Sequence, residues 1–250
     1  MRRLRVGAQL IIWGKRVFQE LPKILDVIAT LNYEGIEASL EIISHYPNYE
    51  ELLKERSLVL SGLHQGVGDM NTSKMALKVL KDLGGGYLIF SSPRPHMDFE
   101  KRCIEVAHFL NDVASIAKNY GVVVCYHNHD WEIADNGRGI KIILENTNPE
   151  LVHLCMDTYW VKYGGLDPVT FMEENLDRIV YLHLKDGTEE DFRKRSFCEL
   201  GRGIIDFESI IGLARRGNVE WLVVEQDSTK ISPEESMQIS RNYLREKFNL

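Results

Sequence analysis

Eight short apolar runs recur along the chain, and amphipathic segments separate most of them. The runs are four to six residues long and rich in valine, isoleucine and leucine, which is typical of strands buried on both faces of a parallel sheet. Neighbouring parallel strands need a crossover between them, and that crossover is usually a helix. The predicted strands are Arg5–Leu10, Gly35–Ala38, Val59–Leu63, Gly86–Phe90, Val122–Tyr126, Val152–Met156, Ile179–Leu182 and Trp221–Val224.

The segments between these runs carry the marks of helices. Apolar residues recur on one face of Phe99–Tyr120, which predicts a long amphipathic helix. A second helix is predicted over residues 21–29, with Pro22 in its first turn, where proline is tolerated. Asp167 and Ser232 are each followed by a proline, and this pairing predicts a helix N-cap followed by the first helical position.

Eight strands that alternate with helices over 250 residues predict an α/β fold, a single (β/α)8 TIM barrel that occupies residues 1–250 as one domain. An open doubly wound sheet is the alternative. No predicted strand is followed by GxGxxG, and the Gly84-Gly85-Gly86 run precedes a strand, so it is interpreted as a helix-to-strand turn. The closed barrel is therefore the favoured architecture.

Charge and cysteine usage limit the classes of partner. The formal net charge is −7, and a modest acidic excess argues against a nucleic-acid backbone or an anionic membrane as the main partner. The four cysteines form no CxxC pair, so we expect free thiols and a cytoplasmic protein. No apolar run approaches the length that spans a bilayer.

Polar residues follow almost every predicted strand. In a barrel of this kind the catalytic side chains lie at the carboxyl ends of the strands and in the loops that follow. Half of the eight histidines fall at these positions, together with several carboxylates. The residues at or just after the strand ends are Gln9, Glu37, His64, His127, His129, Asp157, His183, Lys185, Asp186, Glu225 and Asp227.

Three of these residues predict a metal site. Asp157, His183 and Glu225 end three successive strands, and carboxylates that point at one axis repel one another unless a cation joins them. One imidazole with several carboxylates suits a single divalent ion such as Mn²⁺, Zn²⁺, Mg²⁺ or Co²⁺. Alternation along the strands places His127 and His129 on one face, and that face looks toward the same centre if it is the barrel interior.

A set of short motifs, in a fixed order, resembles the sugar phosphate isomerase/epimerase family of xylose isomerase-like TIM barrels. This family includes tagatose and psicose 3-epimerases, the inosose dehydratase and isomerase of inositol catabolism, hydroxypyruvate isomerase and, as an outlying relative, endonuclease IV. The resemblance covers nearly the whole chain. The motifs that carry it are YHNHDWE (Tyr126–Glu132), MDTYW (Met156–Trp160), GGLDP (Gly164–Pro168), HLKDG (His183–Gly187), ELGRGIIDF (Glu199–Phe207) and VVEQD (Val223–Asp227).

The resemblance implies a four-residue ligand set for one divalent metal. Asp157, His183 and Glu225 match three of the family's ligands. For the fourth, either His127 takes the ligand position at the end of strand five, or the loop folds back and Glu132 supplies a carboxylate. We favour Glu132 here, because a carboxylate would restore the family's ligand set.

The resemblance also implies the chemistry, a metal-dependent isomerisation or epimerisation of a keto-sugar or polyol through an enediolate. Arg94 could meet a phosphate, but no glycine-rich phosphate cradle accompanies it, which favours an unphosphorylated substrate. Glu132 and Glu225 would exchange protons on opposite faces of the sugar if both lie at the metal. If His127 is the ligand instead, a one-base isomerisation or a β-elimination of water follows, with His127, His129 or Glu199 as the acid.

Other residues are candidate substrate contacts. Glu37 and His64 could bind sugar hydroxyls, or could form structural hydrogen bonds inside the barrel. Lys185 could neutralise oxyanion charge, or could form a salt bridge with a neighbouring carboxylate. Trp160 stands where the epimerases carry a histidine, and it could stack on a sugar face but not move a proton.

Two other classes of function stay open at this point. A phosphodiesterase like endonuclease IV would need a three-zinc cluster, and Trp160 replaces a histidine that such a cluster would use. A non-catalytic sugar-binding barrel is the other alternative, since a fold does not establish an activity. A homodimer is possible, because barrels of this group often pair.

Overall fold

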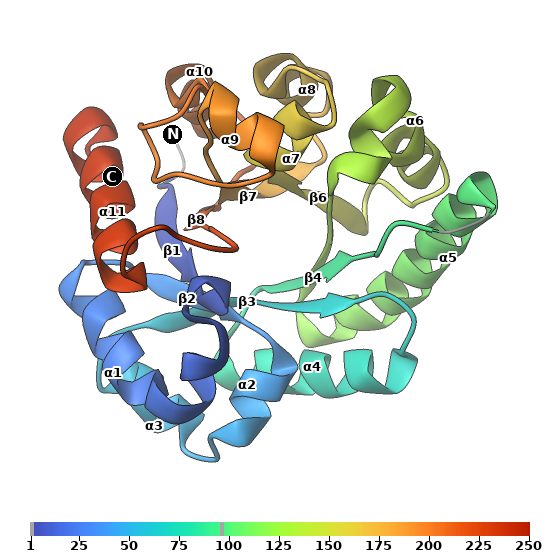
Figure 1. The fold of residues 1–250 in the computed structure, drawn as a ribbon. Helices are drawn as coiled ribbons and strands as arrows, with labels where there is room; N and C mark the ends of the chain where they lie inside the picture. Colours follow the sequence, from blue (N-terminus) through green and yellow to red (C-terminus); the bar gives the residue numbers. More distant parts are fainter. Residues whose placement is uncertain (1–2, 96–97) are drawn as a thin grey trace.

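The protein is a closed barrel of eight parallel strands surrounded by helices, in a computed structural model that describes residues 3–95 and 98–250. Each strand pairs with the next along the chain, and β8 pairs with β1 to close the barrel. Figure 1 shows the strands in the middle of the molecule and the helices as an outer ring. The strands are β1 (Arg5–Gln9), β2 (Gly35–Ala38), β3 (Val59–Gly66), β4 (Tyr87–Ser91), β5 (Val123–His127), β6 (Val152–Asp157), β7 (Ile179–Leu184) and β8 (Trp221–Val224).

The helices follow the strands in the alternating order that the sequence predicts. They are the 3-10 turns η1 (Leu10–Arg16) and η2 (Lys118–Tyr120) and the helices α1 (Val17–Thr30), α2 (Leu40–His45), α3 (Tyr49–Lys54), α4 (Met70–Leu83), α5 (Phe99–Ala117), α6 (Asp130–Glu145), α7 (Thr158–Tyr163), α8 (Pro168–Glu174), α9 (Glu189–Lys194), α10 (Phe207–Arg216) and α11 (Pro233–Phe248). The (β/α)8 barrel prediction is confirmed.

Local signals position these helices as expected. The Asp167 side chain caps α8 by accepting from the N–H of Thr170 at 2.9 Å, and the Ser232 hydroxyl caps α11 in the same way. Gly84 ends α4 in the left-handed region (φ 68°), which explains the predicted helix-to-strand turn. The helix predicted from Leu21 begins earlier, at Val17, but Glu20 is non-helical, so Pro22 still lies just after a helical start.

Five strands run further than their apolar residues predict. The strands β3, β4, β5, β6 and β7 continue through polar residues that the apolar pattern had assigned to loops, among them His64, His127 and Asp157. These residues pair with the neighbouring strand, for example His127 with Cys155 and Asp157 with His183. Polar side chains at the carboxyl end are therefore held on rigid sheet rather than on loops.

Two separate apolar layers hold the barrel. The larger fills the space between the strands and the helices, with residues such as Ile24, Leu110 and Leu222. The smaller fills the barrel interior and contains Tyr181, Trp221 and neighbours from β4, β5 and β6. The interior layer closes the barrel below its carboxyl end and forms a solid base on which polar residues can stand.

Strand alternation then fixes what stands on that base. Cys125, Cys155, Tyr181 and Val223 belong to the interior layer, and the inward position two residues later on each chain segment is His127, Asp157, His183 and Glu225. These four side chains are consequently directed to one centre at the carboxyl end of the barrel.

Within the described residues, none of the helices combines the length and the apolar character needed to cross a membrane.

Candidate metal centre

Four side chains meet at the carboxyl end of the barrel. His127, Asp157, His183 and Glu225 are all buried, and each offers a ligand atom within 4.8 Å of the others. The His127 Nε2 atom lies 3.5 Å from Asp157 Oδ2 and 4.0 Å from Glu225 Oε2. His183 Nδ1 is in direct contact with Glu225 Oε2. The predicted convergence of three of these residues is therefore present in the structure, and His127 joins them.

Several ligand atoms of these residues lack a regular hydrogen bond. Within the described part of the chain, neither ring nitrogen of His127 has a hydrogen-bond partner, while Asp157 Oδ2, His183 Nδ1 and Glu225 Oε2 make ion-pair contacts within the cluster or with Lys185. Buried polar atoms are nearly always hydrogen-bonded, so this set of atoms needs an explanation. Two imidazole nitrogens and two carboxylate oxygens around one point form a donor set that suits a divalent ion. The residues fit a metal ion.

Asp157 both caps a helix and contributes an oxygen to the cluster. Its Oδ1 accepts from the backbone N–H of Trp160 at 2.8 Å and caps α7, while its Oδ2 faces the cluster. The Asn128 side chain accepts from the backbone N–H of Asp157 at 3.0 Å. The cap and the Asn128 contact together fix the carboxylate in one orientation.

Glu37 contacts the His183 ring nitrogen that faces away from the cluster. Glu37 Oε2 lies 2.7 Å from His183 Nε2, which leaves Nδ1 as the nitrogen that faces the cluster. Its other oxygen lies 3.2 Å from His64 Nδ1, and His64 Nε2 lies 3.0 Å from the hydroxyl of Ser91. Burial raises the pKa of Glu37, but His183 and His64 outweigh burial and lower it to about 2. A carboxylate behind a histidine that can bind metal orients the ring and makes it a better ligand.

Lys185 is a buried cation beside the same carboxylates. Its Nζ lies 2.9 Å from Glu225 Oε1, 2.9 Å from Asp227 Oδ2 and 3.3 Å from Asp157 Oδ2. Burial lowers the pKa of Lys185, but the three carboxylates outweigh burial and raise it well above its usual value. Burial lowers the pKa of His183, but neighbouring groups that include Glu225 and Glu37 raise it well above its usual value. When all four carboxyl groups are ionised, Glu37, Asp157, Glu225 and Asp227 give four negative charges against the Lys185 ammonium and the His183 ring, a formal excess of two. A divalent cation would reduce that excess.

The two histidines of the YHNHDWE motif are held neutral. Burial lowers the pKa of His127 well below its usual value, and the nearby His183 lowers it further. Burial and His127 together lower the pKa of His129 to about 3. The His127 and His129 rings are 4.9 Å apart, so His129 adjoins the cluster. Neutral imidazole is the form that binds a metal ion or accepts a proton.

Glu132 does not lie with these residues. It is fully buried in the first turn of α6, where its Oε1 accepts from the Tyr126 hydroxyl at 2.5 Å and its Oε2 accepts from the backbone N–H of His129 at 2.9 Å. Burial raises the pKa of Glu132 well above its usual value. The carboxylate that we favoured as the fourth ligand thus caps a helix, and His127 has the placement that a fourth ligand needs.

Trp160 and Glu199 also lie apart from the cluster. Trp160 is buried between two cations, with Lys185 Nζ 5.2 Å and Arg195 Cζ 4.9 Å from its ring centre. Glu199 accepts from Arg202 at 3.0 Å and lines a neighbouring cavity with Phe197 and Lys230. Neither residue lines the cavity that opens above the cluster.

Asp186 anchors the loop that carries Glu199. Its two carboxylate oxygens accept from the backbone N–H groups of Gly201 and Gly203, each at 3.0 Å, and of Ile205 at 3.3 Å. Gly201 is in the left-handed region (φ 79°), and a Cβ on it would collide with the Tyr243 ring. Gly201 is therefore required both by its backbone conformation and by this tight packing.

A cavity of about 480 Å³ opens above the cluster. Its polar lining contains His64, His127, His129 and Glu225, and also Asp227, whose side chain is 34% exposed. Asp227 lies just after a predicted strand end, but it is not among the predicted site residues. Strand alternation could have identified it, because the period of two places Asp227 on the same face as Glu225.

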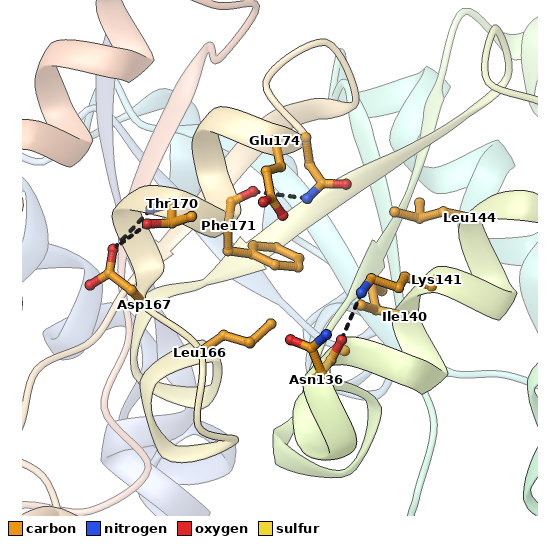
Figure 2. Close-up of a pocket in the computed structure, with 11 residues that line it drawn as sticks. Asn136, Ile140, Lys141, Leu144, Leu166, Asp167, Thr170, Phe171 and Glu174 are labelled. Carbon is orange, nitrogen blue, oxygen red and sulfur yellow. Dashed lines mark hydrogen bonds between the residues drawn. The ribbon is translucent and has the colours of Figure 1, made fainter.

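A different cavity, of about 360 Å³, lies on the outer ring between α6 and α8 (Figure 2). Its polar side chains serve local structure: Asp167 caps α8, and the Lys141 ammonium donates to the backbone carbonyl of Asn136 at 2.9 Å. None of the predicted site residues lines it. The candidate site is therefore the cavity at the carboxyl end of the barrel.

The fold and the cluster define a class, a TIM barrel with a candidate divalent-metal centre at the carboxyl ends of its strands. The chain belongs to the xylose isomerase-like TIM barrel family, whose model matches residues 25–247.

Curated relatives include inosose dehydratases. The protein from Clostridium tetani is 31% identical over 165 residues, which are 59% of this chain and 55% of that protein. The protein from Geobacillus kaustophilus is 26% identical over an alignment 263 positions long, gaps included, which covers 89% of this chain and 85% of that protein. The chain thus matches little more than half of the length of the Clostridium tetani relative and most of the other.

Solved structures with the same fold carry related names. A sugar phosphate isomerase/epimerase from Parabacteroides distasonis has a TM-score of 0.82 at 21% identity, over 98% of this chain and 94% of that one. The 3-keto-D-glucoside 4-epimerase from E. coli has a TM-score of 0.75 at 16% identity, over 97% and 99%. The IOLI protein, described with a bound zinc atom, has a TM-score of 0.76 at 15% identity, over 97% of each chain. At these identities the likeness shows the shared fold.

Proposed function

We propose that the chain is a divalent-metal-dependent sugar isomerase or epimerase, which removes a proton next to the carbonyl group of a keto-sugar or polyol ketone. The observation that supports this proposal most strongly is the convergence of two buried imidazoles and two buried carboxylates at the base of the cavity. The enzyme names of the relatives support the same class of substrate.

In this proposal, His127, Asp157, His183 and Glu225 hold the ion, with Glu37 orienting His183. Bound there, a divalent ion supplies Lewis-acid polarisation of a carbonyl oxygen and lowers the energy of the negative charge that forms on it. Lys185 stays protonated beside the same carboxylates and adds a second positive charge in a buried site, where electrostatic stabilisation is strong.

Glu225 is the proposed base. It lines the cavity, and its Oε1 accepts from the Lys185 ammonium, which keeps the carboxylate ionised. Exchange between two facing glutamates would require Glu132 at the cluster, but Glu132 is bound to Tyr126 and to the His129 backbone. We therefore propose a single-base transfer, with Asp227 as the other carboxylate on the cavity wall.

A dehydratase is the second candidate function, because the curated relatives are named inosose dehydratases. Loss of water after proton removal needs an acid for the departing hydroxyl. His129 lines the same cavity and adjoins His127, and its neutral ring would donate a hydrogen bond to the departing hydroxyl, while the proton that Glu225 removes would leave with that hydroxyl as water. The proposed compartment is the cytoplasm, where the thiols of the four free cysteines would persist.

Metal removal tests the proposal. Protein that has been treated with a chelator and dialysed should incorporate solvent deuterium into keto-sugars and inososes at about 5% of the original rate or less. This loss is expected because the Lewis acid has been removed. Reloading with Mn²⁺, Zn²⁺, Co²⁺ or Mg²⁺ should restore it, and one of these ions should restore it best. Proton NMR in D₂O reports the exchange and distinguishes an isomer from a dehydrated product. Full exchange by metal-free protein would contradict the proposal.

A further inference from the structure

The cavity above the cluster has two unlike halves. One half is lined by two of the metal-binding candidates, His127 and Glu225, together with His64, His129 and Asp227. The other half is formed by the segment after β1, the start of α1, the end of β2 and α2, which supply apolar side chains. These are Leu10, Ile11, Val17, Phe18, Ala38 and Ile42.

The apolar half is part of the fold and not a loose surface. Leu10, Val17, Ala38 and Ile42 are buried and belong to the main apolar core. The Gln9 side chain accepts from the backbone N–H of Ile11 and fixes the turn that follows β1. Figure 1 shows this dark-blue turn on the side of the barrel near α2. The wall is therefore preorganised beside the candidate metal centre.

Ile11 leaves apolar surface uncovered at this wall. The residue is 43% exposed, which makes it one of the few large apolar residues that the described part of the chain leaves exposed. A single exposed isoleucine is ordinary, but this one continues a wall of apolar side chains in a concave site. Such a wall gains free energy when an apolar group covers it.

The charges around the cavity exclude one kind of occupant. Among the described residues that line it there is no lysine and no arginine, and its exposed charges are carboxylates such as Glu41 and Asp227. Away from the metal centre, a phosphate or carboxylate group here would meet carboxylates and no basic side chain. An apolar substituent would meet matching apolar side chains and would need no basic partner.

We propose that the substrate is a keto-sugar or polyol ketone that carries an aryl or alkyl substituent, which packs against Ile11, Phe18 and Ile42 while its oxygens face the metal centre. This inference rests on the proposed function and narrows it to a substrate class. A free sugar would leave the apolar half of the cavity filled with water.

A second cavity beside the first contains the basic residues that a phosphorylated sugar would need. It adjoins the same site through His129 and Ser91, and Arg94 and Arg195 line it. Arg195 already pairs with Asp130 at 3.1 Å and lies over the Trp160 ring, so it is not free to hold an anion. Arg94 is exposed and is flanked by prolines. A preference for a phosphorylated sugar would point to this cavity.

Binding of matched glycosides tests the inference. Titration calorimetry on Mn²⁺-loaded protein compares methyl β-D-glucopyranoside, phenyl β-D-glucopyranoside and glucose 1-phosphate. We expect the phenyl form to bind about tenfold more tightly than the methyl form, from the apolar area that the ring covers. The Ile11→Ser variant should reduce that ratio to about threefold or less, by the same area argument.

Ile204→Ser is the matched control, because Ile204 is 48% exposed but does not line the cavity. It should keep the wild-type ratio. Equal affinity for the two glycosides, no detectable binding of the phenyl form, or tightest binding of the phosphate would each overturn the inference. The proposed function fails separately, if deuterium exchange is metal-independent while the phenyl preference persists.

Discussion

Replacing Glu225 by glutamine is expected to lower kcat/KM by about a thousandfold, since the variant loses the proposed base and weakens one metal ligand. The change keeps the shape of the side chain, and Glu225 lies directly beside His183 and Lys185. The amide nitrogen cannot accept a proton or bind a cation. Steady-state kinetics on the best substrate from the exchange screen measures the loss.

Glu220→Gln is the matched control for this change. Glu220 precedes β8 at the opposite end of the barrel, and its carboxylate accepts from the Tyr87 hydroxyl at 2.8 Å, a bond that glutamine can also accept. We expect wild-type kinetics for Glu220→Gln and a folded barrel, by circular dichroism, for both variants. If Glu225→Gln keeps more than a tenth of wild-type turnover, Glu225 is not the base.

His127→Ala should weaken metal binding, whereas Glu132→Gln should leave metal binding nearly unchanged. Removing His127 deletes a proposed ligand and should weaken metal binding by at least about 100-fold, because even the loss of an outer partner weakens it about 10–100-fold. Removing the Glu132 carboxylate should leave metal affinity within about threefold of wild type. Competition against a chromogenic chelator measures both affinities.

Glu132→Gln should instead lower the free energy of unfolding. Tyr126 and the His129 backbone both donate to Glu132, and glutamine has only one acceptor oxygen for two donors. One buried donor would then be unsatisfied, which costs about 1–3 kcal/mol. Chemical denaturation measures this loss. A large fall in metal affinity for Glu132→Gln, with none for His127→Ala, would restore Glu132 as the ligand.

The fold could be predicted because each local signal agreed with the architecture. The apolar runs of β7 and β8 are long enough to identify strands, and residues such as Asp167 and Ser232 mark helix starts. The strand ends were misjudged for a physical reason. His64 and His127 are polar, so an apolar pattern stops before them, although the sheet continues.

The centre of the site could be predicted from the same alternation. Asp157, His183 and Glu225 lie two residues after interior apolar positions, so the period of two directs them to one point. His127 obeys the same period. Glu132 was favoured on the ligand set of the family, but in the structure it stands one turn into α6, where it stabilises a helix start.

The rest of the site depends on contacts that no local pattern records. The sequence does not show that Lys185 meets three carboxylates from β6 and from the segment at the end of β8. Nor does it show that Trp160 is covered by Arg195, or that Glu199 opens into another cavity. Packing between segments far apart in the chain decides these placements.

Anomalous X-ray diffraction from a crystal loaded with Mn²⁺ or Zn²⁺ tests the central claim most directly. The prediction is one peak per chain, with His127 Nε2, Asp157 Oδ2, His183 Nδ1 and a Glu225 oxygen each at about 2.0–2.2 Å from the ion. Glu132 should remain bound to Tyr126 and to the His129 backbone. A peak coordinated by Glu132, several ions in one cluster, or no peak at this site would contradict the account.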